Sequence, residues 1–291
     1  MTEPAHLRIG ALSRRVGVSP ELLRALEERY GLLEPIRSAG GFRLYSSADE
    51  DRVRSMRRHL DAGVSAAQAA RLALARSEPA GGHDDTAAIE ELAAELRSTL
   101  DRLDEPGAHA TFDRLLAAFT LQTVLRDVVL PYLQELGERW QRGEASVAQE
   151  HFASNVLRGR LLGLARGWDG GGGPRALLAC PPGEYHDLAL IAFGLALRGH
   201  GWRITFLGPD TPLDTIADTA EALEPAAIVV AASEVTRLEA ARSGLRRLAR
   251  LAPLWLAGAG ATADVAKATK GSLLELEPVA AAGRVAEATR A

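Results

Sequence analysis

Short β-rich apolar runs alternate with helical stretches through the C-terminal part of this 291-residue chain. The apolar runs lie at 176–180, 203–207, 227–231, 254–257 and 273–276, and helical stretches lie between them at 188–198, 213–223 and 237–251. Because parallel strands need a long crossover connection, usually a helix, this order predicts βαβ units and a doubly wound parallel sheet. Ligands of such sheets bind at the carboxyl ends of the strands.

Two glycine-rich stretches, 77–85 and 169–174, have the composition of linkers. They divide the chain into parts at 1–76, 86–168 and 175–291. The first part contains short helices separated by turns. The middle part has apolar residues at three- and four-residue spacing, which predicts a four-helix bundle.

Composition excludes several classes of protein. No apolar run approaches the roughly 20 residues that cross a bilayer, and the first residues lack the apolar core of a signal peptide, so we expect a cytoplasmic protein without membrane contact. Cys180 is the single cysteine, which rules out an internal disulfide. It closes an apolar run and is interpreted as a core residue, although a catalytic thiol is left open.

The charge distribution confines any nucleic-acid role to the N-terminal part. The whole chain has a formal net charge of −4, whereas residues 1–78 contain 13 Arg and only 10 acidic residues. Arginine suits contacts to phosphates and guanine through its planar fork.

The N-terminal part has the pattern of a helix-turn-helix. Residues 9–16 can form one helix, and Gly17-Val18 a turn; Ser19 is an N-cap with Pro20 at the first position of the next helix, 21–29. We expect the second helix to enter the major groove. It is expected to bury Leu22, Leu23 and Leu26 and to expose Glu21, Arg24 and Glu28.

Residues 35–45 have the pattern of a wing, with a Gly40-Gly41 turn and a basic, aromatic strand that ends at Tyr45. The predicted fold class is therefore multidomain, α and α/β: a winged helix-turn-helix, then a four-helix bundle, then a doubly wound parallel sheet of flavodoxin or Rossmann type.

The first 75 residues resemble the MerR family of transcription regulators. The matching pieces are Ile9-Gly10-Ala11-Leu12-Ser13, Gly17-Val18-Ser19, Leu23-Arg24, Gly31-Leu32-Leu33, Gly41-Phe42-Arg43-Leu44-Tyr45 and a helix from Ser47. The resemblance implies binding to a double-stranded DNA operator as a homo-oligomer, with DNA contacts from Arg14 or Arg15, Arg24, Arg37, Arg43 and Tyr45. Each arginine could instead be a solvated surface residue. Leu26 departs from the aromatic residue common at its position.

The loop after the first predicted strand contains a candidate metal ligand. His186 follows Glu184 by two residues, and a carboxylate at that distance can accept the second ring N–H of a ligating imidazole. By itself the pair could equally be a helix cap or a surface feature.

This loop, with two later ones, resembles the cobalamin-binding fold. The matching pieces are Glu184-Tyr185-His186, Ser233-Glu234-Val235 and Ala257-Gly258-Ala259-Gly260. The resemblance implies that His186 is the lower axial ligand of cobalt. It implies a cofactor pocket that is also lined by Glu184, Tyr185, Asp187, Gly208, Pro209, Asp210, Thr211, Ser233, Val235, Gly258 and Gly260. The small residues are expected where the backbone passes the cofactor's tail. Ala189, Val235 and Ala257 depart from the family pattern, and we expect a tighter pocket.

The middle part is similar to the helical cap of light-responsive MerR regulators of the CarH/LitR type. Trp140 closes one helix, and the capping box of Ser146 and Gln149 starts the next, with Glu150 and His151 in its first turns. By this resemblance Trp140, Glu150 and His151 surround the adenosyl group of adenosylcobalamin. Gln141, beside Trp140, is a poor cobalt ligand. Any binding of a histidine to the upper face of cobalt after loss of the adenosyl group is therefore assigned to His151.

These features predict a DNA-binding regulator, and no enzyme. We expect a repressor that binds DNA as a dimer or tetramer with adenosylcobalamin in the dark and releases it when light breaks the cobalt–carbon bond. A regulator that senses cobalamin or another ligand without light is the main alternative. A cobalamin-dependent enzyme module would need a substrate domain for which the chain has no length. The operator, the target genes and the oligomeric state stay open.

Overall fold

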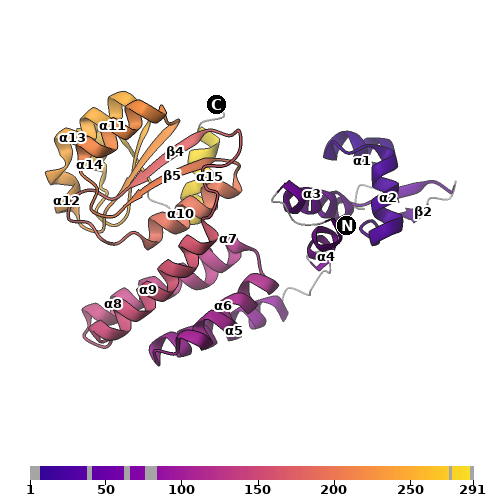
Figure 1. Cartoon of the computed structure of the whole chain (residues 1–291), viewed down its shortest axis with the longest axis horizontal. Helices are drawn as coiled ribbons and strands as arrows, with labels where there is room; N and C mark the ends of the chain where they lie inside the picture. The colour runs from indigo at the N-terminus through magenta and orange to yellow at the C-terminus, as the bar shows by residue number, and fades with distance from the viewer. Residues whose placement is uncertain (1–6, 38–40, 62–65, 76–83, 275–276, 289–291) are drawn as a thin grey trace. The chain divides into compact units, whose positions relative to one another are not determined.

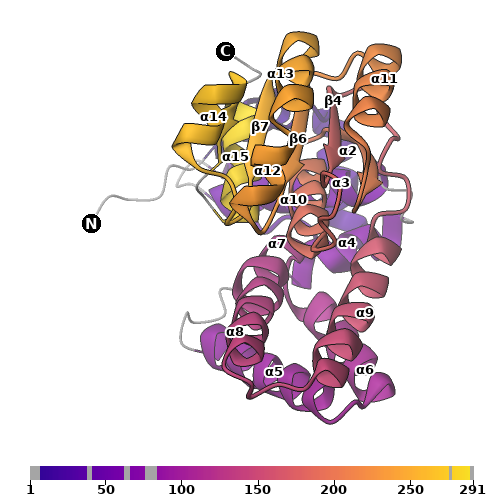
Figure 2. The ribbon, with the colours of Figure 1, turned by 90° about the vertical axis from the view of Figure 1, so that its left-hand side faces the viewer.

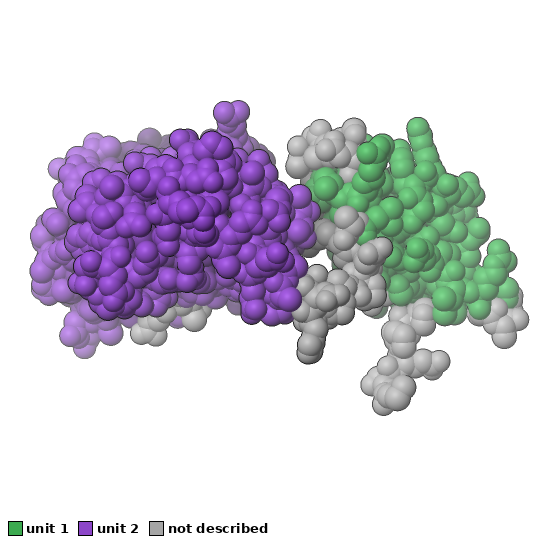
Figure 3. All heavy atoms as spheres, turned by 90° about the horizontal axis from the view of Figure 1, so that it is seen from below, with its two compact units in different colours: residues 1–85 green, residues 86–291 purple. Residues whose placement is uncertain are grey.

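A computed structural model describes residues 7–37, 41–61, 66–75, 84–274 and 277–288 of the chain. The chain divides into two compact units, Met1–Asp85 and Thr86–Ala291 (Figure 3). Most of the predicted linker at 77–85 lies outside the described residues, and Asp84 and Asp85 already belong to a helix.

The first unit is a small helical fold with a three-stranded antiparallel sheet of order β1-β3-β2. Its elements are β1 (Leu7–Arg8), α1 (Ile9–Val16), α2 (Pro20–Tyr30), β2 (Ile36–Arg37), β3 (Arg43–Tyr45), α3 (Ser47–Asp61) and α4 (Ala66–Ala75). The side chain of Ser19 accepts a hydrogen bond from the Leu22 amide, and Gly17 ends α1 with φ of 65°. The predicted helix-turn-helix and the wing strands are therefore present; the wing residues 38–40 lie outside the described part.

The core of this unit corrects one expectation. Leu12, Leu23 and Leu32 are fully buried, but Leu22 is 52% exposed. Successive helical residues are about 100° apart, so a short helix that turns Leu23 inward turns Leu22 toward solvent.

The second unit begins with the helical bundle. It consists of α5 (Asp84–Asp101), α6 (Glu105–Ala118), α7 (Leu121–Val124), the π-helical turn η1 (Leu125–Val129), α8 (Leu130–Gln141) and α9 (Val147–Leu164). Because α7, η1 and α8 follow one another without a break, the predicted four-helix bundle is confirmed. Pro131 has no amide hydrogen to donate backward, which is a physical reason for the widened turn before it. In the part of the chain that the structure describes, no helix is long and apolar enough to cross a membrane.

The parallel sheet follows, with strand order β5-β4-β6-β7-β8. The strands are β4 (Arg175–Ala179), β5 (Arg203–Gly208), β6 (Ala227–Ala231), β7 (Leu254–Ala257) and β8 (Ser272–Leu273) (Figure 1). The helices are α10 (Leu188–Gly199), α11 (Leu213–Leu223), α12 (Val235–Ala240), α13 (Arg242–Leu251), α14 (Ala263–Thr269) and α15 (Pro278–Ala288). The doubly wound sheet is confirmed, and the order is that of flavodoxin-like folds. The helix expected at 237–251 is two helices, interrupted at Ala241.

Successive residues of the parallel strands point to opposite faces of the sheet and so pack into two different cores. Ala176 and Leu178 of β4 face the side that carries α10, α15 and the bundle, whereas Leu177 and Ala179 face α11, α13 and α14. Figure 2 shows the bundle beside α10. Bundle and sheet therefore share one core. Cys180 is fully buried in it, and burial raises the pKa of its thiol to about 12, which favours the core interpretation.

The predicted linker at 169–174 is largely exposed but is anchored at both ends. Trp168, just before it, meets the edge of Phe206 with ring centroids 5.7 Å apart. Asp169 pairs with Arg175 at 2.8 Å. A Cβ on Gly173 would lie 1.9 Å from the carbonyl oxygen of Gly201. Here glycine permits a close approach of two backbones.

Candidate functional site

Glu184 lies at the centre of the loops that follow the parallel strands. Its side chain is 2% exposed and connects the loop after β4 with the loop after β6. Oε2 accepts hydrogen bonds from the amide of Ser233 at 2.6 Å and from its hydroxyl at 2.7 Å. Oε1 accepts from the amide of His186 at 2.8 Å and lies 2.7 Å from its Nδ1. β4 lies between β5 and β6 in the sheet, which brings these distant residues together.

The charge state of Glu184 decides which nitrogen of His186 is open. Burial by itself would raise the pKa of Glu184, but the hydrogen bonds from Ser233 and His186 outweigh it and lower the pKa to about 2. An ionised carboxylate can only accept, so in a neutral imidazole the proton is on Nδ1 and the lone pair on Nε2. The His186 side chain is 79% exposed, and no described residue is hydrogen-bonded to Nε2. An imidazole with one nitrogen anchored and the other open has the form of a metal ligand.

The loop after β5 supports the loop that carries His186. The carboxylate of Asp210 accepts from the amide of Gly183 at 2.7 Å and from the hydroxyl of Tyr185 at 3.3 Å. Thr211 is buried; its amide donates to the carbonyl of Cys180, and its hydroxyl donates to the carbonyl of Gly208. The predicted pocket residues 208–211 therefore lie beside the His186 loop, and Tyr185 is exposed above them.

Gly258 and Gly260 are required by contacts within the chain. A Cβ on Gly258 would lie 2.4 Å from the carbonyl oxygen of Ala232, and one on Gly260 would lie 2.4 Å from the carbonyl of Glu234. These glycines let the loop after β7 approach the loop that carries Ser233. From the sequence alone, these glycines are expected where the backbone passes close to the cofactor's tail. The contacts between the two loops are a second reason for glycine at both positions. Val235 starts α12 and is 37% exposed.

Asp187 has a different role from the one expected. Its side chain is 3% exposed and accepts hydrogen bonds from Arg158 of α9, with Nη2–Oδ2 at 2.8 Å and Nε–Oδ2 at 3.0 Å. A carboxylate engaged in this way is not free to line a pocket, so Asp187 joins the bundle to the His186 loop. Arg158 was missed because nothing local marks a partner 29 residues away.

Of the three residues predicted for the upper face, Trp140 at the end of α8 and His151 near the start of α9 are exposed, and Glu150 is partly buried. Trp140 is 53% exposed, and the predicted capping box of Ser146 and Gln149 is present. The side chain of His151 is 70% exposed, with Nε2 3.5 Å from Glu150. His151 precedes Arg158 by two helical turns, about 10 Å, and so lies on the same face of α9. That face reaches the His186 loop through Asp187.

In the first unit, the predicted DNA-contacting arginines are exposed. Arg14, Arg24 and Arg37 lie at the surface. Arg15 pairs with Glu50 at 3.3 Å, and Arg43 pairs with Glu27 at 3.1 Å.

Tyr45 does not fit the expected DNA contact. It is fully buried, and its hydroxyl donates to Glu27 at 3.0 Å. Burial, followed by this hydrogen bond, raises its pKa to about 12. Tyr45 therefore anchors β3 to α2. Arg43 lies two residues earlier, on the same face of the strand, and pairs with the same glutamate.

A hollow of about 270 Å³ lies beneath the wing. Its basic lining comes from β1, α2 and the two wing strands: Arg8, Arg24, Arg37 and Arg43. The guanidinium of Arg8 lies 4.5 Å from the ring centroid of Phe42. Arg8 was missed because the helix-turn-helix pattern begins at Ile9, and only the pairing of β1 with β3 brings Arg8 to the wing.

Sequence profiles of known families match all three parts of the chain. Residues 7–75 match the profile described as MerR HTH family regulatory protein. Residues 92–162 and 174–275 match two profiles, each described as a B12 binding domain.

Individual relatives agree with these matches. The chain is 33% identical over 266 residues to the HTH-type transcriptional repressor CarH of Myxococcus xanthus, covering 87% of this chain and 89% of that repressor. It is 34% identical over 209 residues to the repressor CarA of the same organism, covering 71% and 69%. A solved monomethylamine corrinoid protein of Methanosarcina barkeri has the same fold over 68% of this chain and 99% of its own, with a TM-score of 0.58 and 16% identity. The two curated relatives are repressors, in agreement with the prediction of a regulator.

Proposed function

The chain belongs to the family of MerR-type, B12-binding transcriptional repressors that includes CarH and CarA, and from this we propose that it represses transcription under the control of light through bound adenosylcobalamin. The observation that carries the proposal is the arrangement of Glu184, His186 and Ser233 at the edge of the sheet.

His186 is the proposed lower axial ligand of cobalt. Oε1 of Glu184 lies 2.7 Å from Nδ1 of His186 and would accept its hydrogen bond. This bond keeps the proton of the neutral ring on Nδ1, leaves the lone pair on Nε2 and makes the ring more basic. Ser233 donates two hydrogen bonds to the other oxygen of Glu184 and so fixes the carboxylate. When bound, adenosylcobalamin supplies a cobalt–carbon bond that light can break.

Trp140, Glu150 and His151 are the proposed contacts of the adenosyl group. Trp140 and His151 are exposed although the tryptophan ring is large and apolar, which suits a surface that a ligand covers. Glu150 is held by the hydroxyl of Ser154 at 2.7 Å. Loss of the adenosyl group would remove the ligand from this surface and free the turn to move.

The first unit is the proposed operator-binding part. The arginines around the hollow beneath the wing would grip phosphates, and the exposed side of α2 would enter the major groove. Assembly of a dimer or tetramer would engage several such units at once and raise affinity without new contacts, so that disassembly in light releases the DNA.

Retention of colour tests the cofactor. After mixing with adenosylcobalamin in the dark, the wild-type protein should keep a red chromophore through desalting. His186→Ala should lose most of the colour, whereas His200→Ala, an exposed histidine at the end of α10, should keep it. A colourless wild-type protein would reject the proposal.

Light dependence is tested separately by gel filtration and operator binding before and after green light. A smaller assembly and weaker operator binding after illumination are expected. Unchanged size and affinity, in a protein that does bind the cofactor, would favour the alternative of a regulator that senses cobalamin without light.

A further inference from the structure

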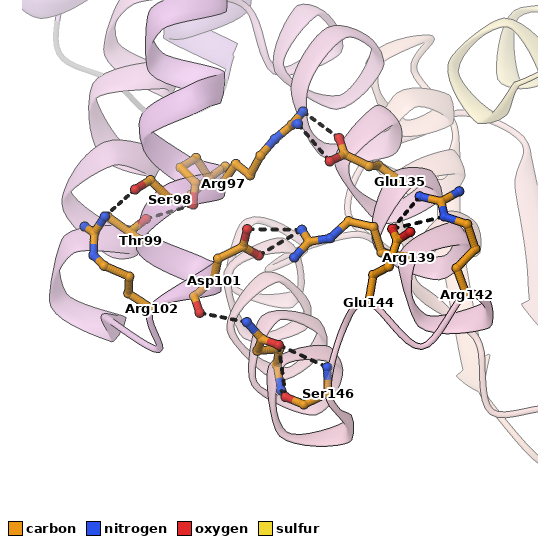
Figure 4. A network of polar contacts seen from close by, with 12 residues as sticks. Arg97, Ser98, Thr99, Asp101, Arg102, Glu135, Arg139, Arg142, Glu144 and Ser146 are labelled. Atoms are coloured by element: carbon orange, nitrogen blue, oxygen red, sulfur yellow. Dashed lines mark hydrogen bonds and ion pairs between the residues drawn. The ribbon is translucent and has the colours of Figure 1, made fainter.

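One residue of the bundle holds both ends of the turn that presents Trp140 and His151. Asp101, the last residue of α5, accepts two hydrogen bonds from Nη1 of Arg139, one on each carboxylate oxygen at 3.1 Å. Its backbone carbonyl accepts a third from Nε2 of Gln149 at 3.1 Å. Arg139, which faces Asp101 in Figure 4, lies in the last turn of α8. Gln149 lies in the first turn of α9.

We propose that Asp101 is a positioning residue for the upper-face contacts, because it holds Trp140 and the Glu150–His151 pair in register across the α8–α9 turn. The inference rests on the proposed function for its consequence, the preference for an adenosyl group, but the positioning itself is a property of the protein without cofactor.

The two residues that bind Asp101, Arg139 and Gln149, each directly precede a residue proposed to contact the adenosyl group. Arg139 precedes Trp140, and its own backbone carbonyl accepts from the amides of Glu144 and Ala145, so the arginine is tied into the turn. Gln149 precedes Glu150 and uses both ends of its side chain. Its Oε1 accepts from the amide of Ser146 at 3.0 Å, while its Nε2 donates to Asp101.

Apart from its own backbone hydrogen bonds, the buried Ala145 and the exposed Arg142–Glu144 pair, the described structure shows little else that fixes this turn. Trp140 is 53% exposed, Val147 is 59% exposed and the His151 side chain is 70% exposed, so the apolar packing available to hold them is small. The side chains of Arg139 and Asp101 are by contrast only 18% and 27% exposed, which protects their ion pair from solvent screening.

A neighbouring ion pair offers a matched control. Arg97 and Glu135 also join α5 to α8, at 2.6 Å, one helical turn farther from the α8–α9 turn (Figure 4). Among the described residues, neither side chain makes a hydrogen bond or a close ion pair with the residues of that turn. Glu135→Gln therefore weakens a second, more exposed link between the same helices without releasing the turn.

Two variants cut the two ties separately. Asp101→Asn weakens the link to Arg139. Gln149→Glu removes the donor to the Asp101 carbonyl but keeps an acceptor for the Ser146 amide, so the capping box survives and the helix N-terminus gains a favourable negative charge. Loosening of the turn in this variant would not come from a lost cap.

The first readout is amide hydrogen exchange of residues 139–151 in the cofactor-free protein. Faster exchange is expected in Asp101→Asn and Gln149→Glu, with Glu135→Gln like the wild type. Exchange unchanged in both variants, or raised equally in the control, would overturn the inference whatever the cofactor does.

The second readout compares affinity for adenosylcobalamin with affinity for hydroxocobalamin. The two variants should lose about tenfold of the preference for the adenosyl form, the scale of a lost supporting contact. They should keep the absorption spectrum of the histidine-ligated hydroxo form, because His186 is untouched. If the variants exchange faster but keep the wild-type preference for adenosylcobalamin, the proposed effect of Asp101 on ligand preference is overturned. A wild-type protein without preference would instead refute the proposed function and leave the positioning to be judged by exchange.

Discussion

Each unit of the molecule contains buried carboxylates that join separate segments of chain, and the most buried described carboxylates of the two units, Asp49 and Glu184, differ in what they leave open. In the first unit, Asp49 is fully buried and accepts hydrogen bonds from the amide of Glu34 at 2.9 Å, from the amide and hydroxyl of Ser46, and from Arg52 at 2.6 Å. In the second, Glu184 accepts from Ser233 and His186.

One hydrogen-bond donor of each carboxylate, Arg52 for Asp49 and His186 for Glu184, accounts for the difference. Arg52 is 7% exposed and can only donate, so the cluster around Asp49 is closed and its effect is stability. His186 is exposed and its second ring nitrogen has no partner among the described residues, so the cluster around Glu184 presents an open nitrogen to solvent, as the proposed metal ligand requires. A buried carboxylate becomes part of a binding site where one of its donors has a second, open function.

The largest expected effect is that of Asp49→Ala, which sharpens the comparison on the side of stability. The change leaves Arg52 and two backbone amides without their buried acceptor, and we expect the first unit to lose about 3–5 kcal/mol of unfolding free energy. Urea unfolding followed by circular dichroism measures it. Asp51→Ala, with an exposed side chain, should change the free energy by less than about 0.5 kcal/mol.

Glu184→Gln tests the other side of the comparison. The amide keeps the shape but removes the charge that holds the proton on Nδ1, so cobalamin affinity should fall about 10- to 100-fold with modest loss of stability. Titration with hydroxocobalamin measures the affinity. Glu234→Gln changes an exposed carboxylate beside Ser233 and should have no effect. Wild-type affinity in Glu184→Gln would mean that this cluster too is only structural.

Arg158→Gln is expected to have a smaller effect. It leaves Asp187 buried without its cation; because Arg158 is 39% exposed, water can replace part of the interaction, and we expect a loss of about 1–2 kcal/mol in the second unit. Thermal unfolding of that unit measures this loss. Since Asp187 adjoins His186, the spectrum of bound cobalamin should also shift. If Arg158→Gln is as stable as the wild type and the spectrum of its bound cobalamin is unchanged, Asp187 has no influence on the proposed cobalamin site.

Acid should weaken the Asp49 cluster gradually. Burial would raise the pKa of Asp49, but the hydrogen bonds from Glu34, Arg52 and Ser46 outweigh it, and the pKa lies below the ordinary value of 3.8. A carboxyl with a lowered pKa in the folded state stabilises fully above its unfolded pKa, and this stabilisation is lost as the pH falls through that value toward the folded one. Urea unfolding at pH 5 and pH 3 should show the loss in the wild type and a smaller one in Asp49→Asn. An equal loss in both would assign the acid sensitivity to other groups.

Local patterns in the sequence were sufficient for much of the fold. The apolar runs at 227–231 and 254–257 coincide with β6 and β7, because a fully buried parallel strand needs an uninterrupted apolar run. The capping box at Ser146 and the spacing from Glu184 to His186 were also predicted, since both depend on residues two or three positions apart.

Partners far apart in the sequence were beyond such rules. Arg158 and Asp187 are 29 residues apart, and Ser233 and Glu184 are 49 residues apart. The burial of Tyr45 against Glu27, the packing of Gly173 on Gly201 and the arrival of Arg8 at the wing depend in the same way on how elements meet.

The sequence alone determined the order of helices and strands in the parallel sheet, the N-caps at Ser19 and Ser146, and the loop that carries an imidazole beside a carboxylate. Only the tertiary structure decided which carboxylates are closed by buried partners and which donor keeps an open nitrogen. The physical reason is that periodicity and capping act over a few residues, whereas burial and hydrogen-bond satisfaction depend on whatever the fold brings into contact.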